Sequence, residues 1–364
     1  MTKLDLKDAI ALRATWIWPL LAAGALVAAS FIGMPAWFAL VCAVCLIGAV
    51  FAAVHHAEVI AGRLGEPVGP LVLAIAVTVI EVGLIASIML GFGEPKPTLA
   101  RDTVFAAVMI VCNGIVGASL LSGGVRHHEQ NFRLESASAA LAVLAALTAL
   151  TMIVPNVTTT AAGPVFSNSQ TAFAAIVSLL LYGAFLFTQT VTHRQSFMPP
   201  EGEEFHGHDF EPTLRATWFS FGVLLVALTA VVILAKLLTP PLEQAIAIAG
   251  APKGLVGVVI AAIVLLPEGV ASLRAARDNR LQSSLNLALG SALASIALTI
   301  PAIGAISIAT GYRIELGLPI KEVVLLALTL LISVITLGTG RTTMLQGMVH
   351  LAIFASFIFF VIVP

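Results

Sequence analysis

Long runs of apolar residues, each about as long as a membrane-crossing helix, repeat along the whole chain of 364 residues. A spanning helix needs roughly 20 apolar residues to cross the hydrocarbon core of a bilayer. Between charged residues and Pro or Gly, the sequence contains about eleven such runs: 14–33, 36–54, 70–93, 103–124, 136–154, 170–190, 217–238, 254–275, 283–308, 321–338 and 345–363. The chain is therefore predicted to be an all-α integral membrane protein with about eleven transmembrane helices.

Composition supports this prediction. Hydrophobic residues make up 59% of the chain and charged residues 10%, with a mean hydropathy of +1.04. A soluble domain typically carries about 25% charged residues to cover its surface. The net charge of −1 gives no indication of a nucleic-acid partner, so the expected partners are the lipid bilayer and small ions. The three cysteines lie inside apolar runs and resemble small hydrophobic residues rather than a disulfide framework.

The first apolar run has two interpretations, a cleaved signal peptide or a retained first helix. The stretch from Ala14 is long enough to span, and Asp5 and Asp8 are unusual in the basic start of a signal peptide, which favours a retained helix. With the N-terminus in the cytoplasm, twelve of the 18 Lys and Arg residues fall on the cytoplasmic side. Because short cytoplasmic loops are enriched in these residues, the C-terminus is predicted on the far side.

One acidic, His-bearing loop divides the chain. Residues 1–34 form an N-terminal tail and first helix, 35–193 a first set of five helices, 194–213 the cytoplasmic loop, and 214–364 a second set of five. An odd number of spans per half turns the second half upside down relative to the first. This is the layout of inverted-repeat transporters, which bind substrate near the membrane midplane.

Two carboxylates lie inside corresponding spans of the two halves. Glu81 occurs in "VTVIEVGLIAS" and Glu268 in "IVLLPEGVAS". A charged group in a membrane span costs about 2.5–3.5 kcal/mol on insertion scales, so it usually has a function. Two neighbouring carboxylates repel each other, which favours proton uptake, and they also suit a hard cation. A pair that holds either protons or a cation, but not both, is what an antiporter requires.

Further oxygen atoms could complete a cation site. Thr78 shares a helix face with Glu81, and Pro267 removes the helical partner of the Ile263 carbonyl. Asn113 is the polar residue of the fourth span, while Ser291 and Ser295 begin a stripe that continues to Thr299. Each has an alternative interpretation, because Ser and Thr often bond to their own helix and Asn can join helices.

Other titratable residues have weaker indications. Glu58, with His55 and His56, could form a cytoplasmic entrance or pH gate. His350 is expected to make an interhelical hydrogen bond rather than bind a metal, and the acidic loop is either solvated or regulatory. The chain lacks an HExxH pair, a nucleophile turn with a His and an Asp dyad, so an intramembrane enzyme is not expected.

The sequence resembles the calcium/proton antiporter family of the calcium/cation antiporter superfamily, especially its bacterial members. The first family repeat is matched by "HHAEVIAGRLGEPVGPLVLAIAVTVIEV", through Glu58, Arg63-Leu64-Gly65, Gly69 and Glu81. The second is matched by "VLLPEGVASLRAARDNRLQSSLNLALGS", through Glu268, Asn279 and Gly290-Ser291. The family Gly-Asn pairs are replaced by Val77-Thr78 and Val264-Leu265, which removes two amide oxygens and makes sodium and potassium candidates beside calcium.

This resemblance implies Glu81 and Glu268 as the cation and proton sites of a secondary antiporter in a bacterial inner membrane. The expected activity is export of calcium, or of sodium and potassium, in exchange for protons, without a cofactor. The alternative is a cation channel or structural membrane subunit without proton coupling. The sequence leaves open which cation is carried and whether the protein forms a homo-oligomer.

Overall fold

The computed structural model describes residues 6–65, 68–89, 96–198, 212–252 and 254–363, with side chains from residue 15 onward except at 68–71 and 73. The chain forms two compact units. Unit 1 takes Met1–Phe92 and Gly207–Val256, and unit 2 takes Gly93–His206 and Gly257–Pro364. Each unit thus draws on both halves of the sequence, and the units are described separately. The division into two inverted five-helix repeats stays a prediction.

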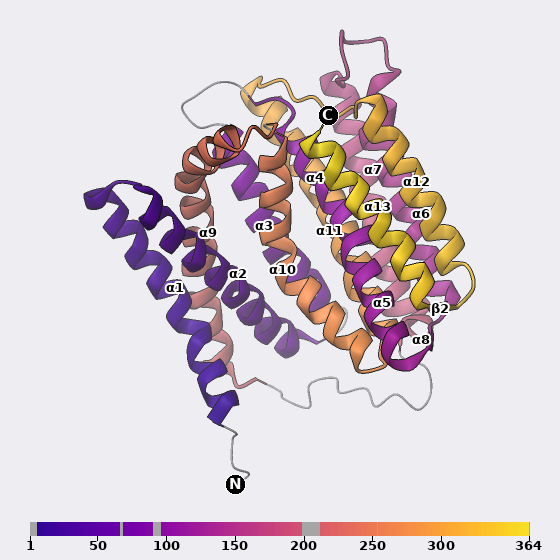
Figure 1. The fold of residues 1–364 in the computed structure, drawn as a ribbon, viewed down its shortest axis with the longest axis horizontal. Helices are drawn as coiled ribbons and strands as arrows, with labels where there is room; N and C mark the ends of the chain where they lie inside the picture. Colours follow the sequence, from indigo (N-terminus) through magenta and orange to yellow (C-terminus); the bar gives the residue numbers. More distant parts are fainter. Residues whose placement is uncertain (1–5, 66–67, 90–95, 199–211, 253, 364) are drawn as a thin grey trace. The chain divides into compact units, whose positions relative to one another are not determined.

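Unit 1 is a bundle of four long helices (Figure 1): α1 (Leu6–Ile32), α2 (Ala36–Leu64), α3 (Val68–Met89) and α9 (Leu214–Ile248). Helix α2 packs against the other three. It begins after Pro35, whose fixed φ suits a helix start, and ends at Gly65, which adopts a φ of 64°. Both α2 and α9 extend beyond the predicted boundaries, and α9 continues through Pro240 and Pro241.

Unit 2 contains the remaining helices and one short sheet (Figure 1). Its elements are α4 (Leu99–Met109), the π-helix η1 (Ile110–Ile115), α5 (Val116–His127), β1 (Glu129–Asn131), α6 (Leu134–Thr148), the π-helix η2 (Ala149–Ile153), the 3-10 helix η3 (Val154–Asn156), α7 (Asn168–Phe187), the π-helix η4 (Thr188–Thr192), α8 (Arg194–Phe197), α10 (Leu255–Arg277), α11 (Leu281–Thr310), α12 (Ile320–Leu337), β2 (Arg341–Thr343) and α13 (Met344–Ile362).

Local sequence explains where several of these helices begin and end. Ser167 and Gln170 form a capping box at the start of α7, in which each side chain bonds to the backbone amide of the other residue. The hydroxyl of Thr213 accepts a hydrogen bond from the amide of Ala216 at the start of α9. Gly311 adopts a φ of 71° and ends α11, as glycine commonly does after a helix.

The predicted number of spans is confirmed approximately. Ten helices among the described residues are long and apolar enough to cross a membrane, and Ala74–Met89 adds a shorter apolar helix. The strand pair β1–β2 is an addition that the sequence did not indicate, and its antiparallel register places Gln130 opposite Thr342. Of the predicted acidic loop, residues 199–211 lie outside the described residues, while Arg194–Phe197 forms α8.

Helices α5 and α13 pack side by side at unusually close range (Figure 1). A Cβ atom on Gly347 would lie 2.4 Å from the amide nitrogen of Leu121 and 2.8 Å from the carbonyl oxygen of Gly117. A Cβ atom on Gly124 would lie 2.4 Å from the amide nitrogen of Met344. Small residues are therefore required where these two backbones meet, as is common between membrane helices.

Candidate functional site

The two membrane carboxylates lie at similar positions of their helices. Glu81 lies thirteen residues after Val68, the first described residue of α3, and Glu268 lies thirteen residues after Leu255, where α10 begins. Both side chains are buried, with 4% and 7% of their surface exposed, and each interacts with other groups of the chain. Glu81 belongs to unit 1 and Glu268 to unit 2, so their meeting in one site stays a prediction.

In unit 1, Thr78 lies buried one turn before Glu81. Its hydroxyl donates a hydrogen bond to the carbonyl of Ala74 at 2.8 Å, which leaves the lone pairs of its oxygen available to a cation. The predicted position on the face of Glu81 is therefore compatible with a ligand and with back-bonding to its own helix.

His56 is buried at the junction of α1, α2 and α9. Its Nε2 lies 3.3 Å from the carbonyl oxygen of Thr15, and its Nδ1 lies 3.1 Å from the hydroxyl of Ser220. Because a carbonyl can only accept, Nε2 is assigned the proton and Nδ1 accepts from Ser220. His56 therefore joins three helices, whereas His55 is half-buried and Glu58 is exposed. The role of these three residues as a gate stays a prediction.

In unit 2, Asn113 is the centre of a buried polar cluster. Its amide nitrogen donates to the hydroxyl of Thr329 at 2.9 Å, and its oxygen lies 3.2 Å from Nδ1 of His350. The interhelical hydrogen bond predicted for His350 is thus present. Asn113 lies in η1, a wider helical turn of a kind that is frequent at functional sites. Both ends of its amide are engaged, so a ligand role for Asn113 would require these bonds to rearrange.

We expect Asn113→Ala to lower the free energy of unfolding by about 1–3 kcal/mol, because it removes two buried interhelical hydrogen bonds, one to Thr329 and one to His350. Thermal unfolding of the purified protein in detergent measures this. Ser178→Ala is the control. The buried Ser178 hydroxyl has no hydrogen-bond partner among the described residues, so its removal breaks no hydrogen bond there. Equal stability of Asn113→Ala and the wild type would contradict the assigned packing role.

The helix that carries Glu268 contains a proline next to it. Pro267 lies inside α10, where it cannot donate a backbone hydrogen bond to the Ile263 carbonyl four residues earlier. The predicted free carbonyl, five residues before Glu268, therefore has a structural basis in Pro267.

The predicted hydroxyl stripe lies on one continuous helix, α11. Ser295 is 5% exposed, and Thr299 is fully buried. The Thr299 hydroxyl has no hydrogen-bond partner within the described ranges, which is unusual for a buried group. Ser291 is half-buried. The sequence pattern includes Thr299 in the stripe, and its unsatisfied buried hydroxyl makes it a candidate cation ligand beside Ser291 and Ser295.

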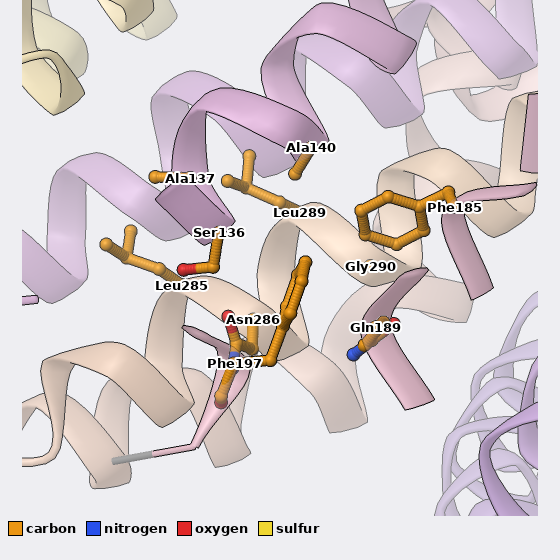
Figure 2. Close-up of a pocket in the computed structure, with 10 residues that line it drawn as sticks. All are labelled: Ser136, Ala137, Ala140, Phe185, Gln189, Phe197, Leu285, Asn286, Leu289 and Gly290. Atoms are coloured by element: carbon orange, nitrogen blue, oxygen red, sulfur yellow. The ribbon is translucent and has the colours of Figure 1, made fainter. Parts of the chain in front are cut away.

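A small pocket in unit 2 lies between α6, α8 and α11 (Figure 2). It is lined by polar side chains of Ser136, Gln189 and Asn286, by the ring of Phe197 and by Gly290. Its volume of about 10 Å³ is close to the minimum needed for one water molecule. The amide of Asn286 donates to the carbonyl of Phe197 at 2.7 Å, which fixes α8 against α11. This pocket is suited to a water molecule.

Sequence comparison gives a family for the chain. The model of the sodium/calcium exchanger protein family matches residues 34–191 and 219–363. A protein of Sinorhizobium fredii (strain NBRC 101917 / NGR234), named as a candidate ionic transporter, y4hA, is 50% identical over 319 residues, which cover 88% of this chain and 87% of that protein.

Two further similarities agree with this match. The sodium-potassium/proton antiporter ChaA of Escherichia coli (strain K12) is 34% identical over 316 residues, which cover 86% of this chain and 85% of the relative. The crystal structure of an H⁺/Ca²⁺ exchanger, CAX, superposes with a TM-score of 0.71 at 17% identity, covering 97% of this chain and 89% of that one. The structural likeness establishes the fold, and the sequence matches establish the relationship.

Proposed function

The chain belongs to the sodium/calcium exchanger protein family, and we propose that it is a secondary active antiporter that exports cations from the cytoplasm in exchange for protons. The observation that carries the proposal is the pair of buried carboxylates, Glu81 and Glu268, at similar positions of α3 and α10. Intramembrane carboxylates of this kind commonly mark ion pathways and proton relays. Each carboxyl group holds a proton in one state of the cycle and contacts the cation in the other.

Calcium is the first candidate cation, with sodium and potassium as the others. Calcium binds six to eight oxygen atoms, and two carboxylates neutralise its charge. One calcium against two protons moves no net charge, whereas a third proton would add about 2.3 kcal/mol per 100 mV of membrane potential. The named activity of the 34% identical relative, sodium-potassium/proton antiport, supports the monovalent ions. The proposed cycle needs no catalytic residue and no cofactor.

The proposed orientation has the N-terminus in the cytoplasm and the C-terminus on the far side of a bacterial inner membrane. It is supported by the excess of Lys and Arg in the loops on the N-terminal side. In this orientation, the turn between α10 and α11 faces the cytoplasm, and so do His55, His56 and Glu58 at the proposed entrance.

Hydroxyl and carbonyl oxygens complete the proposed cation site. Thr78 lies three residues before Glu81, and Ile263 lies five residues before Glu268. Helix α11 supplies Ser291 and Ser295, and Asn113 is a further candidate ligand. We expect Ser291→Ala to raise the cation concentration at half-maximal exchange about threefold to tenfold, the loss of roughly one neutral ligand. A titration of exchange rate against cation concentration measures this. An unchanged curve would show that Ser291 does not bind the cation and only packs against its neighbours.

The experiment that tests the function uses acid-loaded inside-out vesicles containing a pH-sensitive dye. Calcium, sodium and potassium are added separately to vesicles with the wild-type protein and to vesicles without it. We expect at least one cation to dissipate the proton gradient only where the protein is present. If no cation does so, or if cations enter without proton exit, the channel or structural-subunit alternative replaces the antiporter.

A further inference from the structure

Three serine hydroxyls from three different helices meet inside unit 2. The hydroxyl of Ser272 on α10 lies 3.1 Å from that of Ser119 on α5 and 2.8 Å from that of Ser284 on α11. Ser272 can also donate to the carbonyl oxygen of Ser284 at 3.1 Å. All three serines are fully buried. A hydroxyl both donates and accepts, so such a cluster can pass a proton from one oxygen to the next by reorienting.

One member of the cluster, Ser272, lies on the same helix as Glu268, one turn closer to the C-terminal end of α10. Ser272 follows Glu268 by four residues, which places the two side chains on one face of α10 with their Cβ atoms about 6 Å apart. One water molecule can bridge a gap of this size. The shared face therefore connects the buried carboxyl group to the hydroxyl cluster.

The opposite end of the cluster approaches the protein surface. Helix α10 ends at Arg277, and Arg277, Asp278 and Asn279 are exposed. At about 1.5 Å per residue, Glu268 lies roughly 13 Å from this end of α10 and roughly 20 Å from the other. Ser284 is the fourth residue of α11, so the cluster lies about one helical turn from the exposed loop. Ser272 therefore lies between Glu268 and the nearer of the two ends of α10.

We propose that Ser272, together with Ser119 and Ser284, relays protons between Glu268 and the end of unit 2 formed by the α10–α11 turn. This rests on the proposed function, in which Glu268 exchanges a proton for a cation. A proton leaving the Glu268 carboxyl passes through one bridging water molecule to the Ser272 oxygen, the Ser272 proton passes to the Ser284 oxygen, and the Ser284 proton passes to water at the α10–α11 turn. Each serine oxygen keeps one hydrogen after the transfer, Glu268 becomes a carboxylate, and no bond to carbon changes.

In the described part of α3, the corresponding helix of the first half, no serine lies one turn after Glu81. The residue four positions after Glu81 is Ile85, a fully buried apolar side chain. Ser87, the serine on this helix, donates to the carbonyl of Leu84 at 2.9 Å and so bonds to its own backbone. The relay is therefore specific to Glu268, and Ser87 supplies a matched control.

The test measures the exchange rate of Ser272→Ala in the vesicle assay against that of the wild type and Ser87→Ala. We expect the maximal rate of Ser272→Ala to fall about tenfold or more, since a relay step is lost, while the half-saturating cation concentration stays unchanged. Ser272→Thr keeps the hydroxyl and should recover most of the rate. Rates in D₂O and H₂O supply a second readout, and Ser272→Ala should show a larger isotope effect than the wild type.

The outcomes separate the relay from the proposed function. A wild-type protein without cation-dependent proton movement would overturn both. Wild-type exchange with an unchanged rate and isotope effect in Ser272→Ala would overturn the relay alone. A Ser272→Ala protein with lower thermal stability but a normal rate and isotope effect would show that the cluster only packs helices together, which also overturns the relay.

Discussion

Glu81→Gln and Glu268→Gln should each reduce cation-dependent proton movement by at least about a hundredfold, because glutamine can neither release a proton nor neutralise a cation. Glutamine has nearly the same shape as glutamate, and removing a buried charge lowers the cost of membrane insertion. Both variants should therefore reach the membrane in wild-type amounts. The vesicle assay measures the activity, and the protein level in the membrane measures the folding.

Glu135→Gln is the matched control for this pair. Glu135 is exposed in the first turn of α6, so the same chemical change there should leave exchange unchanged. Robust exchange in Glu81→Gln or in Glu268→Gln would show that the substituted carboxylate is not part of the transport site.

Gly347→Ala should destabilise the folded protein by about 2–3 kcal/mol, the upper part of the range for inserting an extra carbon into a packed interior. The new Cβ would lie 2.4 Å from the Leu121 amide nitrogen, and both helices would have to move apart to admit it. The neighbouring atoms belong to the backbone of α5, so they cannot relieve the clash by changing a side-chain rotamer. Thermal unfolding in detergent measures the loss.

Gly183→Ala provides the comparison for this substitution. Gly183 is exposed within α7, and a Cβ atom there would meet nothing within 4 Å. Alanine at this position should keep or slightly raise the stability, since it favours a helix more than glycine does. Equal stability of both variants would show that the α5–α13 crossing tolerates a side chain at residue 347.

The spans and the two carboxylates could be predicted from the sequence because both are local properties. About 20 consecutive apolar residues have few alternatives to a spanning helix, and a glutamate within such a run is conspicuous. The ends of the spans were less certain. Helix α2 continues to Leu64 past the polar residues His55, His56 and Glu58, since a helix leaving the apolar core can keep its backbone hydrogen bonds.

The contacts between helices could not be predicted in the same way. The bond between Ser119 and Ser272 joins residues 153 positions apart, and the bond between Asn113 and His350 joins residues 237 positions apart. Neither follows from a local pattern, because Ser is common in membrane helices for several reasons. An interhelical bond was expected for His350, but the sequence did not identify Asn113 as its partner.

Proton release on cation binding measures whether Glu81 and Glu268 exchange protons for the cation. Purified protein in weakly buffered detergent solution is mixed with calcium, sodium or potassium, and the change in pH is recorded beside the amount of cation bound. We expect proton release with the transported cation, up to about two protons per calcium. The release should fall in each Glu→Gln single variant and disappear in the double variant. Cation binding without proton release, or release that persists in the double variant, would contradict this exchange.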